Sequence, residues 1–128
     1  MAGAHILIIE DDADSMALAQ YLLNHAGHRT IAANDGRTGA QLALDQAPDL
    51  IVCDLQLPAM DGYQVVRHLY GQSTWRRVPL IAVTAASMTG DREKVLEAGF
   101  DGYISKPIVP ENFVAQVEAF LHAASKRL

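Results

Sequence analysis

The amino-acid sequence predicts an α/β fold: a doubly wound, five-stranded parallel sheet with helices on both faces. Short, continuous apolar runs alternate five times with segments whose apolar residues recur at helical spacing. Strands that are apolar throughout are typical of parallel sheets, which are covered on both faces, and the alternation favours right-handed crossovers. There is no repeat, low-complexity segment or linker, so we expect a single domain over residues 1–128, with a core of about residues 5–122 and a flexible C-terminal tail.

The first half of the chain is expected to hold three strands separated by two helices. The strands are predicted over residues 5–9, 28–33 and 50–54. Either Asp12 or Asp14 can cap the first helix, and Gly27 suits the position just after its end. The second helix is predicted to follow the turn at residues 34–36 and to end at Pro48.

The second half continues with two strands and three helices. The strands are predicted over residues 80–84 and 103–105. Helices are expected after an Asp61 cap, over residues 91–98, and from about Pro110, where a helix-starting proline forfeits no hydrogen bond. Residues 85–90 are expected to form a flexible connection, and residues 125–128 a frayed tail.

Composition excludes several classes of function. The net charge of −5 argues against direct nucleic-acid binding, which needs clustered Lys and Arg. Cys53 is the single cysteine and cannot form an internal disulfide, so a cytoplasmic location is expected. A charged and apolar leader is absent, and so is an apolar run of membrane-spanning length, so neither secretion nor a membrane is expected.

Polar or charged side chains follow four of the five predicted strands. Glu10 and Asp11 follow the first strand, Asp54 ends the third, Thr84 ends the fourth and Lys106 follows the fifth. Because the carboxyl ends of parallel strands share one edge of a sheet, where ligands bind in such folds, we expect these five side chains to form one site.

The expected chemistry of this site is phosphoryl transfer to Asp54. Each pair of carboxylates about 4 Å apart costs about 4 kcal/mol at an effective dielectric near 20. Either protonation or a cation must relieve this repulsion, and an all-oxygen site suits Mg²⁺ (or Mn²⁺). An Asp carboxylate can attack a phosphoryl group to form an aspartyl-phosphate. The Lys106 ammonium and the Thr84 hydroxyl would then balance charge on the phosphoryl oxygens.

Together these residues resemble a response-regulator receiver domain, the phosphoacceptor module of two-component signalling. The matching segments lie in order and at receiver-like spacing over nearly the whole chain: Ile6–Asp12, Asp54–Gly62, Val83–Ala85 and Tyr103–Pro107. The resemblance implies a flavodoxin-like strand order of 2-1-3-4-5. Residues 86–91 and 104–108 are more similar to single-domain and hybrid-kinase receivers than to receivers fused to winged-helix outputs.

The resemblance also implies a role for each residue near the metal. Asp11 is expected to be a direct ligand, Glu10 to act through water, and Asp54 to be both ligand and phosphoacceptor. The backbone carbonyl of Gln56 would complete the protein's share of the coordination. Asp12 does not match a ligand position, and we interpret it either as a helix-capping acid or as an acid that contacts the metal ligands without binding the metal.

The family's switch falls on two further positions. The resemblance implies that the Thr84 hydroxyl moves toward the phosphoryl group, that the ring of Tyr103 turns inward, and that the face formed by residues 88–123 changes. The phosphoryl group would come from a sensor histidine kinase or a histidine phosphotransfer protein. The output would be a downstream protein target or an attached domain outside this chain, so the chain is either a stand-alone regulator or part of a larger regulator or hybrid kinase.

Two other functions remain open at this point. A phosphatase of the dehalogenase type also uses Asp, Mg²⁺, Thr and Lys, but it places a second Asp two residues after its nucleophile, where this chain has Gln56. A phosphorylation-independent interaction domain would be favoured by loss of an acid, the Thr or the Lys, and all of these are present. We therefore expect a signalling protein and not an enzyme.

The remaining reactive side chains are expected to be structural. Cys53 precedes Asp54 on a strand, so its side chain should point to the opposite face, into the core. The scattered histidines show no metal-ligand spacing, and surface positions are expected for His25, His28, His68 and His122.

Overall fold

The computed structural model describes residues 3–85 and 91–125 and contains ten regular elements. The strands are β1 (His5–Ile9), β2 (Arg29–Ala33), β3 (Leu50–Asp54), β4 (Leu80–Thr84) and β5 (Gly102–Ser105). The helices are α1 (Ala13–His25), α2 (Gly36–Gln46), α3 (Gly62–Tyr70), α4 (Asp91–Ala98) and α5 (Pro110–Ser125). Residues 86–90 and 126–128, which include most of the expected flexible connection and tail, lie outside this description.

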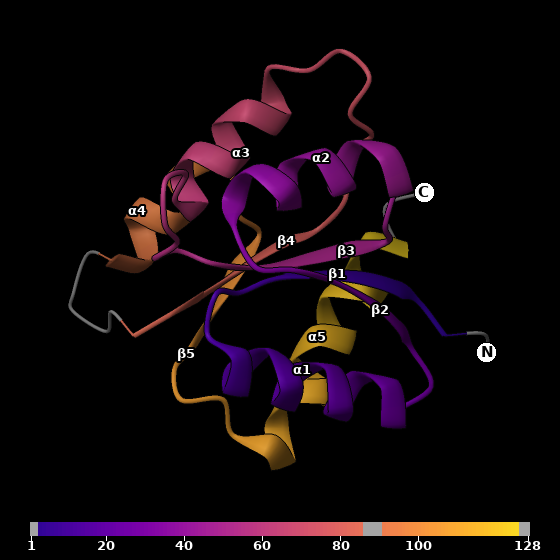
Figure 1. Cartoon of the computed structure of the whole chain (residues 1–128). Helices are drawn as coiled ribbons and strands as arrows, with labels where there is room; N and C mark the ends of the chain where they lie inside the picture. The colour runs from indigo at the N-terminus through magenta and orange to yellow at the C-terminus, as the bar shows by residue number, and fades with distance from the viewer. Residues whose placement is uncertain (1–2, 86–90, 126–128) are drawn as a thin grey trace.

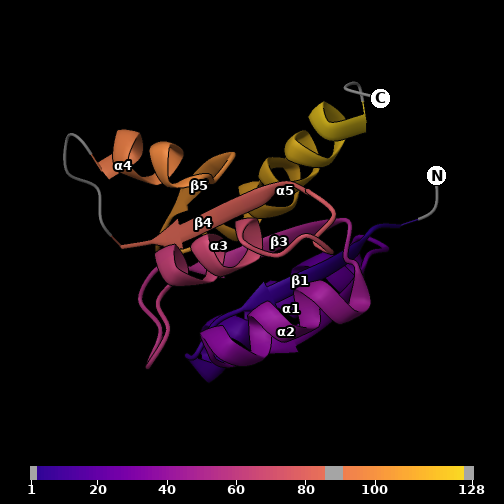
Figure 2. The ribbon, with the colours of Figure 1, turned by 90° about the horizontal axis from the view of Figure 1, so that it is seen from above.

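The five strands form one parallel sheet in the order β2-β1-β3-β4-β5. Helices α1 and α5 cover one face and α2, α3 and α4 cover the other (Figure 1). The view from above shows the twist of the sheet between β1 and β4 (Figure 2), which follows from the handedness of L-residues. The predicted fold class and strand order are confirmed, with β2 starting one residue later and β5 one residue earlier than expected.

Two apolar cores lie on the two faces of the sheet because successive strand side chains point in opposite directions. The core under α2, α3 and α4 includes Leu7, Ile9, Ile51 and Cys53, whereas the core under α1 and α5 includes Ile6, Ile8, Leu50 and Val52. Each aliphatic side chain buried this way contributes about 1.5–3 kcal/mol. Cys53 is a core residue, as predicted, and burial raises the pKa of its thiol.

Three acidic caps start the helices that leave the carboxyl edge of the sheet. Asp12, and not Asp14, caps α1, since its carboxylate accepts from the Ser15 N–H at 2.8 Å. Asp35 caps α2, and Asp61 and Gln64 form a reciprocal capping box at α3. These caps fix where each chain segment turns away from the site.

His28 is not a surface residue, and the prediction for it is wrong. Its side chain is 9% exposed. Its Nδ1 accepts from the Ala4 N–H at 3.0 Å, and its Nε2 lies 2.8 Å from Glu118 Oε2. A backbone N–H can only donate, so Nδ1 is the acceptor and the Nε2–H group donates a hydrogen bond to Glu118. Both partners are distant along the chain, so residue spacing could not reveal them.

The carboxyl end of α3 is joined to the segment that follows α4. The Tyr70 hydroxyl donates to the Gly99 carbonyl at 3.0 Å, and its ring meets the ring of Trp75 edge-on. The Arg77 guanidinium lies over the Tyr70 ring and forms two hydrogen bonds to Asp101.

Over the described residues, none of the helices has the length and apolarity needed to cross a membrane.

Candidate functional site

The carboxyl ends of β1 and β3 lie side by side and bring three acids together. Ile9 pairs with Cys53 in the register of the two strands, so Glu10, Asp11 and Asp54 emerge at the same edge. Carboxylate oxygens of these three residues all lie within 4.8 Å of one another. The sequence therefore predicted this convergence correctly.

The acids differ in exposure and in hydrogen bonding. Glu10 and Asp54 are 6% and 5% exposed, whereas Asp11 is exposed to solvent. Asp54 Oδ1 accepts from the Gln56 N–H at 3.0 Å, and Glu10 Oε2 accepts from the Asp12 N–H at 3.1 Å. These backbone donors fix the orientation of both buried carboxylates.

Lys106 reaches across from the end of β5 and bridges the two buried acids. Its Nζ lies 2.7 Å from Asp54 Oδ2 and 2.9 Å from Glu10 Oε1. Its backbone N–H donates to the Thr84 carbonyl at 2.8 Å, which ties the end of β5 to the end of β4. The lysine thus supplies one positive charge against the acidic cluster.

The titration of this cluster follows from burial and from the lysine. Burial raises the pKa of Glu10, and the neighbouring Asp54 carboxylate raises it further, while Lys106 opposes the shift. Burial alone would lower the pKa of Lys106, but its hydrogen bonds to Asp54 and Glu10 outweigh this effect and raise it. The ammonium is therefore firmly charged at neutral pH.

Thr84 and Tyr103, the two expected switch residues, occupy different places. Thr84 ends β4, is 2% exposed, and lies on the strand next to Asp54 at the same edge. Tyr103 lies on β5 and lines a cavity of about 530 Å³ between α4, β5 and α5, together with Leu96 and Phe120. The structure thus brings Thr84 to the acids and places Tyr103 on the adjoining α4–β5–α5 face.

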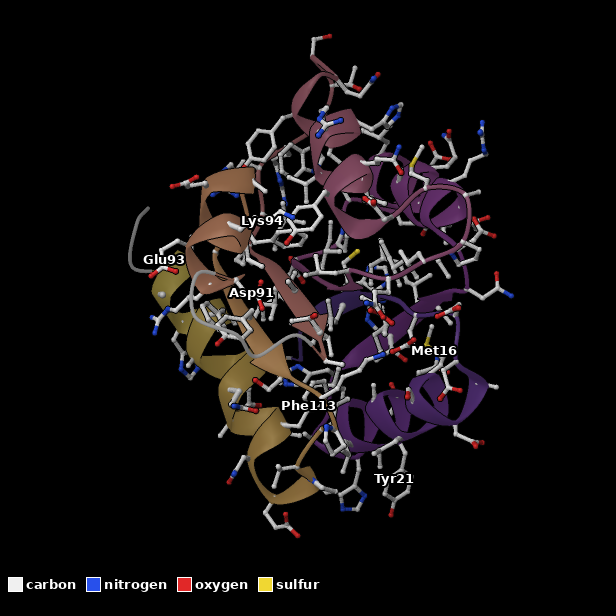
Figure 3. The ribbon with its side chains drawn as sticks, turned by 90° about the vertical axis from the view of Figure 1, so that its left-hand side faces the viewer. Met16, Tyr21, Asp91, Glu93, Lys94 and Phe113 are labelled. Carbon is white, nitrogen blue, oxygen red and sulfur yellow. The ribbon has the colours of Figure 1, made fainter. Side chains whose placement is uncertain are left out.

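Figure 3 looks onto the carboxyl edge of the sheet. Asp91, Glu93 and Lys94 mark the first turn of α4 on one side of this edge, and Met16 marks α1 on the other (Figure 3). The Lys94 Nζ lies 5.1 Å from the centre of the Tyr63 ring of α3. Helix α4 therefore begins at this edge of the sheet, next to α3.

The donor set fits a magnesium ion. Mg²⁺ prefers oxygen ligands and binds through one or two carboxylates while it keeps several waters. Glu10, Asp11 and Asp54 offer carboxylate oxygens within reach of one ion. Gln56 follows Asp54 closely in the β3–α3 loop, so its backbone is adjacent to the cluster.

Comparison with known proteins agrees with this geometry. The family model described as "Response regulator receiver domain" matches residues 6–118. The polar-differentiation response regulator DivK of Brucella anthropi is 37% identical over 116 residues, which cover 91% of this chain and 94% of the relative.

Solved structures show the same likeness. The receiver domain of a sensor histidine kinase from Pseudomonas aeruginosa, with a magnesium ion coordinated in its active-site cleft, is 34% identical with a TM-score of 0.84, covering 94% of this chain and 99% of that chain. A CheY-like receiver domain protein from Methanospirillum hungatei has a TM-score of 0.88 at 23% identity, covering 99% of this chain and 100% of that chain. This second likeness concerns the fold alone.

Proposed function

Because this chain belongs to the response-regulator receiver family of two-component signalling, we propose that Asp54 accepts a phosphoryl group from the phosphohistidine of a partner. The partner is a sensor histidine kinase or a histidine phosphotransfer protein. Members of this family are signalling proteins rather than catalytic enzymes. One observation carries the proposal: Asp54, Glu10 and Asp11 share one edge of the sheet, with the Lys106 ammonium 2.7 Å from Asp54.

The residues of the site have distinct tasks in this reaction. A carboxylate oxygen of Asp54 attacks phosphorus, the bond from phosphorus to the partner's imidazole nitrogen breaks, and the electron pair leaves with the imidazole. Lys106 offsets the charge on the phosphoryl oxygens, and the Thr84 hydroxyl donates to one of them. A Mg²⁺ (or Mn²⁺) ion held by Glu10, Asp11, Asp54 and the Gln56 carbonyl would supply further positive charge to these oxygens.

The proposed output is a change in the α4–β5–α5 face. Once Asp54 carries a phosphoryl group, Lys106 and Thr84 gain new acceptors, and Tyr103 turns inward as Thr84 moves. The link between the Lys106 N–H and the Thr84 carbonyl supports this coupling, because it joins β5 to β4 at the site. A downstream protein would bind this face and sense the difference; residues 88–90 of the expected face lie outside the described residues.

Beryllofluoride and acetyl phosphate test the proposal. With Mg²⁺, either reagent should shift the amide NMR signals of the α4–β5–α5 face in the wild type, and the shift should be lost in Asp54→Asn. Thr84→Ala should still accept the phosphoryl group but should transmit less of the shift to Tyr103. If Thr84→Ala shows the full shift on this face, the proposed switch is wrong.

The same experiment separates the alternative functions. Acetyl phosphate should give a single stoichiometric burst of phosphorylation. Steady turnover of a small phosphomonoester with Mg²⁺ would indicate a dehalogenase-type phosphatase instead. An absence of any Asp54-dependent change would indicate a phosphorylation-independent interaction domain.

We also propose that a single receiver domain, with a core of about residues 5–122, carries this function. The support is that all five strands form one sheet. The cytoplasmic location and the lack of direct contact with nucleic acid or membrane stay predictions from composition.

A further inference from the structure

The β3–α3 loop (residues 55–61) carries the Gln56 carbonyl and is held at both ends. The Gly62 N–H donates to the Leu55 carbonyl at 3.0 Å and closes the loop. The Gln56 N–H donates to Asp54 Oδ1 at 3.0 Å and ties the start of the loop to the acidic cluster. Because the loop is short and held at both ends, a displacement of one part of its backbone should also move Gln56.

Glycine residues in α2 and α3 border this loop closely. A Cβ atom on Gly36, the first residue of α2, would lie 2.1 Å from the Met60 carbonyl oxygen. A Cβ atom on Gly62, the first residue of α3, would lie 2.8 Å from the Asp54 carbonyl oxygen and 2.9 Å from Leu55 Cα. Both distances are far below van der Waals contact, and the obstructing atoms belong to the backbone. The loop therefore lies between two helix starts that only glycine permits.

A side chain at position 36 would displace the loop rather than α2. The helix is fixed by its Asp35 cap and by the buried residues Gly39, Ala40 and Ala43, which pack toward the core. The loop is weaker, since its Gln56, Pro58 and Ala59 residues are exposed. Exposed loop segments with few buried contacts are the parts of a fold that yield at low free-energy cost.

We propose that Gly36 is a positioning residue for the metal site. Its lack of a side chain lets the start of α2 pack directly against Met60 of the loop, and this packing keeps the Gln56 carbonyl in place. The inference rests on the proposed function, in which that carbonyl is a metal ligand. Mg²⁺ demands near-ideal octahedral geometry, whereas Ca²⁺ accepts flexible coordination by six to eight oxygens. A displaced carbonyl should therefore weaken Mg²⁺ binding more than Ca²⁺ binding.

Isothermal titration of the full chain with MgCl₂ and with CaCl₂ tests this inference. For Gly36→Ala we expect Mg²⁺ affinity to fall about tenfold, the scale seen when groups that orient metal ligands are altered, while Ca²⁺ affinity falls less. The ratio of the two affinities is a readout that loss of stability alone does not change. Equal losses for both ions, or an unchanged ratio, would overturn the inference.

Gly39→Ala is the matched control. Its added Cβ would meet the Cδ1 atom of Ile9 at 2.4 Å, a side-chain atom in the core, and not the loop. It should lower the melting temperature while the Mg²⁺ to Ca²⁺ affinity ratio stays that of the wild type. If Gly39→Ala lowers the ratio as much as Gly36→Ala does, crowding of α2 in general is responsible and the inference fails.

A second variant keeps the test decisive if Gly36→Ala does not fold. Ala59 has a φ of 65°, so Ala59→Gly adds no atom and loosens the same loop. It should also lower the affinity ratio, by a smaller factor, and an unchanged ratio would count against a positioned loop. A wild type that binds no Mg²⁺ would refute the proposed function instead, so the two failures are distinguishable.

Discussion

Replacement of Lys106 by methionine should make the free energy of unfolding depend on Mg²⁺. Methionine keeps a similar apolar stem but removes the ammonium that bridges Asp54 and Glu10 at 2.7 and 2.9 Å. In the metal-free variant, the buried carboxylates of Asp54 and Glu10 would lie close to each other and to Asp11 without a neighbouring positive charge. We expect the variant to fold, with a lower free energy of unfolding when a chelator is present.

The size of the loss follows from the two bonds. A hydrogen bond between charged groups contributes about 1.5–3 kcal/mol, and removal of one partner from a buried ion pair costs about 3–5 kcal/mol. The Lys106 side chain is 24% exposed, so solvent screens part of this interaction. We therefore expect a loss near the lower limit, about 3 kcal/mol at pH 7 in chelator. A Mg²⁺ concentration of one hundred times Kd contributes about 2.7 kcal/mol and should recover most of it.

The pH dependence of the loss has a defined sign. In the wild type, burial raises the Glu10 pKa and Lys106 opposes the shift, so removal of Lys106 must raise this pKa further. A carboxyl whose pKa is raised by folding stabilises the protein fully below its ordinary value of 4.5, and this contribution is lost as pH rises through the folded-state pKa. The deficit of the variant should therefore shrink as the pH falls from 7 toward 4.5.

Urea denaturation at pH 7 and pH 5, with EDTA or with Mg²⁺, measures these effects. Lys94→Met is the matched control, because Lys94 contacts the Tyr63 ring at 5.1 Å and such an exposed contact contributes about 0.5–1 kcal/mol. Its small loss should not respond to Mg²⁺. Two results would refute the electrostatic account. One is a Lys106→Met variant as stable as the wild type in EDTA, and the other is a loss of unfolding free energy that changes with neither Mg²⁺ nor pH.

Two further predictions concern stability away from the acids. Hydrogen bonds from Thr38 lower the pKa of Asp35, which caps α2. The ionised Asp35 therefore stabilises the fold above its ordinary pKa of 3.8, and this stabilisation is lost as pH falls through the folded-state pKa. Asp35→Asn keeps a capping side chain but has no carboxylate to protonate, so its melting temperature should fall less in acid. Asp101 accepts from the buried Leu80 N–H at 2.8 Å as well as from Arg77, so Asp101→Ala should cost about 2 kcal/mol in urea denaturation. Arg77→Met leaves the Leu80 N–H bonded to Asp101 and removes the exposed ion pair together with the guanidinium's contacts to the Tyr70 ring and the Val78 carbonyl. It should cost about 1 kcal/mol, less than Asp101→Ala; equal losses would contradict this assignment.

Local signals in the sequence were sufficient for the fold. The runs at residues 5–9, 50–54 and 80–84 matched the observed strands. A strand covered on both faces is apolar through its interior, so polar residues such as His5, Asp54 and Thr84 mark its ends. Boundaries shifted by one residue at β2 and β5, the two edge strands. Edge strands are partly exposed, so their apolar pattern is weaker and their ends are harder to predict.

The candidate site was predictable to the extent that it depends on strand ends. Parallel strands place Glu10, Asp11 and Asp54 at one edge of the sheet regardless of their side-chain conformations. The positions of these residues at strand ends were therefore sufficient to predict that they lie close together. The bridge that Lys106 makes to both buried acids was not predicted, because the lysine was expected to contact a phosphoryl oxygen. In the structure the same ammonium contacts carboxylate oxygens, since these are the negative charges that the chain itself places there.

The helix-start glycines show where local reasoning ends. Asp35-Gly36 and Asp61-Gly62 are both an N-cap followed by glycine at the first helical position, and a cap accounts for the aspartate alone. Glycine is a poor helix former and proline is favoured at this position, so a glycine there requires a reason from outside the helix. That reason is the approach of Met60 to one glycine and of Asp54 to the other, contacts that exist only after both helices pack around the β3–α3 loop. An acidic cap followed by glycine, repeated at two helices beside one loop, is therefore a signal of close backbone approach.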